Sequence, residues 1–180
     1  MTPKALLDYL VYFHAERDYF ECHEVLEEYW KSLSSEQNRD VWVGLIQIAV
    51  GLYHQRRGNI TGAKKILAAS LTRLTPAELD WLGFAGDLLR DAIIERLHDI
   101  EAGLPYADLN LPLRPKLAAQ CEMQCAMEGR HWLSPTNFAD PFLIHKHKLR
   151  DRSAVIAERE RRLSERTPNN QSRIDKPSHM

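Results

Sequence analysis

The chain has 180 residues, of which 44% are hydrophobic and 27% charged, and its formal net charge is −1. A chain of this length buries roughly 70% of its unfolded surface, so its core needs neither disulfides nor a structural metal. The balanced charge gives no indication of a nucleic-acid or membrane partner.

The charge is unevenly distributed along the chain. Residues 141–180 hold 10 Lys and Arg against 5 Asp and Glu, whereas residues 1–140 hold 14 and 20. The three cysteines, an odd number without a signal peptide, predict reduced thiols in the cytoplasm. No segment approaches the ~20 consecutive apolar residues of a membrane span.

The first predicted helices are marked by their capping residues. Thr2 and Pro3 predict an N-cap followed by proline at the first helical position. Asp18 and Glu21 form a capping-box-like pair that opens a second helix with one apolar stripe. Both segments read as helix, and no strand alternation interrupts them.

A longer helix follows, opened by Ser34 and Gln37 and continuing toward Arg57. Its middle, Val41 to Tyr53, is apolar nearly all round, which is typical of a helix at the centre of a bundle. Gly58-Asn59 then predicts one helix end and the next helix start.

The helix after that turn spans Ile60 to Leu74. Thr75 and Pro76, with Glu78, cap a further helix that we expect to continue to Gly103.

The character of the chain changes after Gly103. LPYADLNLPLRP is expected to be extended and to run back over the bundle, and Lys116 to Gly129 reads as one more helix. Leu149 to Arg166 is strongly charged and is expected to form a helix with a thin apolar seam, and the polar residues from Thr167 onward predict disorder. The seam consists of Leu149, Ile156 and Leu163.

The predicted fold is therefore all-α, a compact bundle of about five main helices built from helical hairpins, with a helical C-terminal extension. Residues 1–115 are expected to form the bundle domain, 116–166 the basic helical extension and 167–180 a disordered tail.

The candidate site lies in YFECHEVLEEYW, the second helix. His23 and Glu27 are four residues apart and therefore neighbours, and Glu24 flanks them. In the central helix, Gln47 and His54 share a face with two glycines, Gly44 and Gly51, that would let another helix approach closely. We therefore predict that the two helices pack through these faces.

Three interpretations of this group remain open. The first is a His/Glu/Gln polar network beside the core, with no cofactor expected. The second is a divalent transition-metal site with His23, Glu27 and His54 as ligands. The third is acid–base catalysis by Glu24. The nearest match in this stretch is His-Glu-x-x-Glu, supplied once, which is neither the Glu-x-x-His pattern that di-iron bundles repeat nor a complete His-Glu-x-x-His motif.

Other groups of residues are weaker candidates for a metal or nucleic-acid site. Cys121 and Cys125, with downstream histidines, favour helix packing over zinc, which more often uses Cys-x-x-Cys. HKHKLRDR, from His145 to Arg152, lacks interleaved aromatic residues, so a nucleic-acid partner is not expected.

Two segments together, FECHEVLEEYW (Phe20 to Trp30) and GLIQIAVGLYHQRRGNITGAKKIL (Gly44 to Leu67), resemble the YpuF-like family, known as domain of unknown function 309. The resemblance covers about residues 6–74. It implies a compact, cytoplasmic all-helical bundle without an established activity, sometimes described as a metal-dependent hydrolase. The matching positions are His23, Glu24, Glu27, Trp30, Gln47 and His54.

The leading functional hypothesis is a small non-enzymatic domain that binds a protein partner or a small ligand, and a homo-oligomer is one form of such a partner. The predicted binding residues are Trp30, Gln47 and Arg56. The alternative is a metal-dependent hydrolase, with His23, Glu27 and His54 as metal ligands and Glu24 as the catalytic base.

Overall fold

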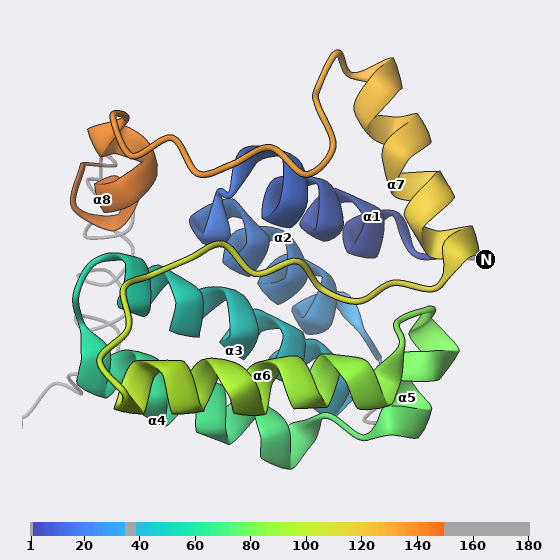
Figure 1. Ribbon diagram of the computed structural model, residues 1–180. Helices are drawn as coiled ribbons and strands as arrows, with labels where there is room; N and C mark the ends of the chain where they lie inside the picture. The colour runs from blue at the N-terminus through green and yellow to red at the C-terminus, as the bar shows by residue number, and fades with distance from the viewer. Residues whose placement is uncertain (1, 35–38, 150–180) are drawn as a thin grey trace, which may run out of the picture. The chain divides into compact units, whose positions relative to one another are not determined.

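The computed structural model describes residues 2–34 and 39–149, which fold almost entirely as helices (Figure 1). A π-helical segment, Tyr12–Glu16, follows the first helix directly. The all-α prediction is confirmed. The α-helices of the described residues are α1 (Lys4–Val11), α2 (Tyr19–Ser32), α3 (Arg39–Arg56), α4 (Ile60–Arg73), α5 (Pro76–Leu82), α6 (Gly86–Glu101), α7 (Pro115–Met127) and α8 (Pro141–Leu149).

Three of the predicted N-caps are confirmed. The Asp18 carboxylate accepts the backbone N–H of Glu21 at 3.1 Å and opens α2. Asn59 caps α4 by accepting the Gly62 N–H at 3.0 Å, and Thr75 caps α5 in the same way. Each of these caps satisfies a backbone donor that the first turn of a helix leaves unpaired.

The first helix begins differently from the prediction. Pro3 is the N-cap residue of α1 and makes no side-chain capping bond. The Thr2 hydroxyl instead donates to Oε1 of Gln120 at 2.9 Å, which ties the N-terminus to α7. The proposed capping box at Ser34 includes Gln37, which lies outside the described residues.

The helix expected from Thr75 to Gly103 is divided into α5 and α6. Gly83 ends α5 in the left-handed conformation, with φ of 95°, and Phe84 follows it fully buried. A Cβ atom on Gly86 would lie 2.4 Å from the Pro76 carbonyl oxygen, so the backbone itself packs closely at this corner. The break thus lets α6 fold back beside the start of α5.

Helix α3 forms the centre of the bundle and packs against both α2 and α4, as its apolar surface predicted. Leu45, Ile48 and Leu52 are fully buried. On the α2 side, the Tyr29 and Trp42 rings meet edge-on with centroids 4.9 Å apart. Burial of such rings contributes much of a core's stabilisation.

Residues 103–114 form an extended segment that crosses the bundle, as predicted, in front of α2 and α3 (Figure 1). Its end is held by backbone bonds from Ala85 N–H to Pro112 O at 2.9 Å and from Arg114 N–H to Gly83 O at 2.8 Å. This segment, called the strap below, covers polar side chains that reach it from the bundle.

Helix α7 packs against α1 (Figure 1), and the described residues up to His147 form one compact unit. Most of the proposed 149–163 seam and the whole 167–180 tail lie outside the described residues. None of the described helices combines the length and apolar character needed to cross a bilayer.

Candidate functional site

The structure brings His23, Glu24 and Glu27 together on α2. One ligand atom from each side chain lies within 4.8 Å of the others, which makes this the one metal-sized group of such residues in ranges 2–34 and 39–149. The Asp18 cap fixes the start of α2, and the spacing of one and four residues then places the three side chains on one helix surface.

Each of the three side chains is about one-third exposed and takes part in a polar interaction. Nδ1 of His23 lies 3.0 Å from Oε1 of Glu24. Oε1 of Glu27 lies 3.0 Å from the Lys31 ammonium, one helical turn further on. The group is therefore reachable from solvent but held in place by neighbours on its own helix.

Trp30 continues this surface, three residues beyond Glu27. The Arg39 guanidinium lies over its ring, 4.8 Å from the centroid. Its indole N–H is buried and has no acceptor among the described residues, and Oε1 of Gln47 on α3 is likewise buried without a donor. Buried polar atoms without partners are uncommon, so both are available to a ligand or a water molecule.

His54 does not join the α2 group. Its Nδ1 lies 3.0 Å from Nδ2 of Asn59 at the turn between α3 and α4. Partial burial lowers the pKa of His54 from its ordinary value, and the Arg57 charge lowers it further. The structure thus brings together three of the four predicted histidine and glutamate residues.

The glycine face of α3 packs against α4, so the prediction that it receives α2 was wrong. A Cβ atom on Gly44 would lie 2.6 Å from the Leu74 side chain, and one on Gly51 would lie 2.5 Å from that of Leu67. A helical projection shows that glycines share a face but does not show which neighbouring helix covers it.

Arg56, the third predicted binding residue, is buried on another side of α3. Its guanidinium donates to the Arg17 carbonyl at 2.7 Å and lies 4.7 Å from the centroid of the Tyr19 ring. Arg17 and Arg96 are also buried, at 2% and 7% exposure. Sequence reasoning missed both, because an arginine is ordinarily an exposed residue.

The cysteines of α7 pack into the protein interior, as predicted. Cys121 and Cys125 are buried and unpaired, and burial raises the pKa of the Cys121 thiol to about 12. No histidine lies with them in a metal-sized group within the described residues. Both side chains therefore act as small apolar groups.

The comparisons with known proteins agree with the resemblance found in the sequence. Residues 6–66, which include the α2 group, match the model of a family described as "Domain of unknown function (DUF309)". The chain is 44% identical over 170 residues to "Uncharacterized protein YpuF" of Bacillus subtilis (strain 168), covering 92% of this chain and 97% of that protein. No solved structure matches this chain. The chain therefore belongs to the DUF309 family.

Proposed function

We propose that this chain is a small binding domain whose ligand on α2 is a divalent transition-metal ion, held by His23, Glu24 and Glu27. The observation that carries the proposal is the approach of three ligand atoms to within 4.8 Å of one another. Imidazole nitrogen and carboxylate oxygen together suit zinc, iron and manganese.

The exposure of the group supports a binding role. The side chains of His23 and Glu24 are 34% and 35% exposed. Three protein ligands leave at least one coordination position of such an ion open, as in sites that exchange water for another ligand. A partner side chain or a small molecule could occupy that position.

A non-enzymatic role fits the group better than hydrolysis does. A hydrolase would require Glu24 as its base. A carboxylate oxygen of Glu24 is, however, one of the three ligand atoms that lie close together, and Oε1 of this residue lies 3.0 Å from Nδ1 of His23. A metal bound by all three residues would leave Glu24 unable to act as a separate general base. The three unpaired, buried cysteines fit a reducing compartment, so we place this function in the cytoplasm.

Titration calorimetry with zinc and manganese chlorides tests the proposal. The unaltered chain should bind one ion, and His23→Ala or Glu27→Gln should weaken binding at least tenfold. His131→Ala removes an exposed histidine far along the chain and serves as the matched control, which should bind like the unaltered protein. Equal affinity in His23→Ala and the control would overturn the proposal.

A further inference from the structure

Buried nitrogen donors without acceptors are concentrated at the C-terminal end of α3 and on α6. They are Nε2 of Gln55 and the Nε atoms of Arg56, Arg57 and Arg96, unpaired within the described residues. Gln55 is 4% exposed, Arg56 8% and Arg96 7%. Because nearly all buried N–H groups in folded proteins are paired, a group made only of donors indicates that an acceptor is missing.

Arg96 and Gln55 are in direct contact. Nη1 of Arg96 donates to Oε1 of Gln55 at 3.4 Å and to the Ala107 carbonyl of the strap at 2.6 Å. With its oxygen facing a guanidinium, the Gln55 amide turns its unpaired NH₂ group elsewhere. The unpaired Nε of Arg96 and Nε2 of Gln55 thus belong to two side chains that touch each other, and Arg96 also reaches the strap.

Neither Arg56 nor Arg96 forms an ion pair with a carboxylate of residues 2–34 or 39–149, and the carboxylate of Asp108, next to Ala107, instead accepts from Tyr106 and Thr136. Among the described residues, ion pairs join Arg17 to Asp108 and Lys146 to Asp18 and Glu21, but none includes Arg56 or Arg96. The acceptors of both guanidiniums are backbone carbonyls and the Gln55 amide. A buried cation without a counter-charge is costly, so an anion at this place would stabilise the fold.

Two tyrosines connect the guanidinium of Arg56 with the same part of the strap. Arg56 lies over the Tyr19 ring at 4.7 Å, and the Tyr19 hydroxyl is 2.8 Å from that of Tyr106. Tyr106 precedes Ala107, the residue that Arg96 contacts. Arg56 therefore adds positive charge that is separated from this part of the strap by the two tyrosines.

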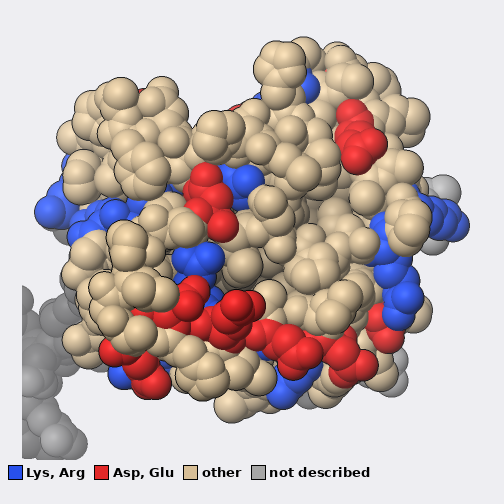
Figure 2. All heavy atoms as spheres, viewed as in Figure 1, with Lys and Arg blue, Asp and Glu red and all other residues tan. Residues whose placement is uncertain are grey.

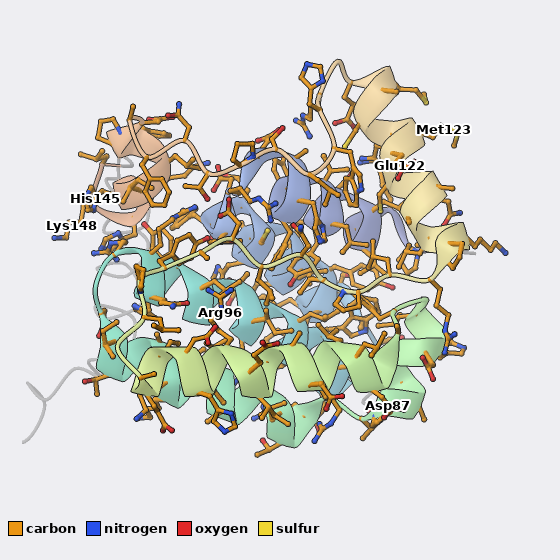
Figure 3. All side chains as sticks on the ribbon, in the orientation of Figure 1. Asp87, Arg96, Glu122, Met123, His145 and Lys148 are labelled. Carbon is orange, nitrogen blue, oxygen red and sulfur yellow. The ribbon has the colours of Figure 1, made fainter. Side chains whose placement is uncertain are left out.

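The molecular surface is hollowed beside these buried donors (Figure 2). Figure 3 labels Arg96 on α6, pointing toward the strap. In the same view, Figure 2 shows a hollow between α6 and the strap, with Lys or Arg atoms in its wall. A row of acidic side chains runs along the lower rim (Figure 2), where α6 lies in the same view. Helix α6 carries an acidic residue at every fourth position, namely Asp87, Asp91, Glu95 and Asp99.

We propose that Arg96 and Gln55 form a binding site for a small oxyanion, a carboxylate or phosphate group, with Arg56 as the neighbouring cation. The planar guanidinium and the amide NH₂ supply donors suited to such oxygens. The acidic row on α6 would repel a polyanion, so the site selects a small ligand over a nucleic acid. The site shares no residue with the proposed metal group on α2, and the two can be tested separately.

The melting temperature in phosphate, acetate and chloride buffers of equal pH and ionic strength tests this site. Phosphate or acetate should raise Tm in a saturable way, and at ten times its Kd the folding equilibrium constant should rise about 11-fold. A response to phosphate alone would identify a phosphoryl ligand, and a response to acetate alone a carboxylate. Equal Tm in all three buffers would overturn the proposal.

Arg96→Met should abolish this response. Arg90→Met is the matched control, because Arg90 lies on the same helix and also donates to backbone carbonyls, those of Leu71 and Leu74. The control should keep the full rise in Tm. An equal rise in both variants would contradict the assignment to Arg96.

Gln55→Glu keeps the test decisive if Arg96→Met does not fold. The substitution places a carboxylate 3.4 Å from the Arg96 guanidinium with little change in shape. It should raise Tm in chloride and remove the response to the oxyanion, because the chain then supplies its own counter-charge. A lower Tm with an unchanged response would show that no anion belongs there.

Discussion

Nε2 of His14 accepts the backbone N–H of Leu111 at 2.9 Å, and this bond joins the strap to the first helical segment. Nδ1 of the same ring donates to the Leu10 carbonyl at 3.0 Å. The two bonds require the neutral imidazole, since a protonated ring could not accept from Leu111. Burial lowers the pKa of His14 to about 3, and the Arg17 charge acts in the same direction.

This arrangement predicts that acid weakens the fold. In the unfolded chain, His14 binds a proton below pH 6.5, but the folded protein does not bind one until about pH 3. The contribution of His14 to the free energy of unfolding should therefore be fully present above pH 6.5. Between pH 6.5 and about pH 3, the free energy of unfolding should fall by about 1.4 kcal/mol for each unit by which the pH decreases. Urea denaturation between pH 7 and pH 4 measures the slope.

His14→Gln should flatten that slope, because glutamine offers a donor and an acceptor but no titrating proton. His98→Gln, a change at an exposed histidine of α6, should leave the slope as in the unaltered protein. A slope that is the same in both variants would show that other groups cause the acid sensitivity.

Gly51→Ala should destabilise the protein by about 1–2 kcal/mol, although alanine is the better helix former by about 1 kcal/mol. The new methyl group would lie 2.5 Å from Cγ of Leu67, which is fully buried. Denaturant titration of Gly51→Ala, Leu67→Ala and the double variant forms a cycle. In the Leu67→Ala background the change should become neutral or stabilising, and additive effects would contradict close packing of α3 on α4.

Arg17→Lys should cost about 3 kcal/mol in the free energy of unfolding, nearly as much as Arg17→Met. The Arg17 guanidinium donates to Ser134 O, Leu109 O and Asn110 Oδ1 at 2.8, 3.0 and 2.7 Å, and a single ammonium cannot reach all three. Arg114→Lys, at an exposed ion pair, should cost less than about 1 kcal/mol in the same denaturation experiment. If Arg17→Lys lowers the free energy of unfolding only slightly, the hydrogen bonds of the Arg17 guanidinium contribute little to stability.

The sequence predicted the parts of the fold that depend on short-range rules. The caps at Asp18, Asn59 and Thr75 and the central position of α3 follow from residue type and helical period. Which helix covers the glycine face of α3, and which arginines are buried, depends on how the helices and the strap pack together. The projection of a single helix does not contain that information. Gly83 and Gly86 form the break between α5 and α6, and the prediction of one helix from the Thr75 cap to Gly103 did not take them into account.

The candidate site was predicted in part for the same reason. His23, Glu24 and Glu27 lie on one helix, so their spacing was enough to bring them together. His54 belongs to another helix, and its placement required knowing how α2 and α3 are rotated against each other. The group at Arg96 and Gln55 combines residues 41 apart in the chain and left no local pattern.

Elemental analysis of protein purified without a metal-binding tag or chelator tests the central claim most directly. The account predicts close to one zinc, manganese or iron ion per chain in the unaltered protein and in His131→Ala, and almost none in His23→Ala. The same metal content in His23→Ala as in the unaltered protein, or none in either after exposure to these ions, would contradict a metal site on α2.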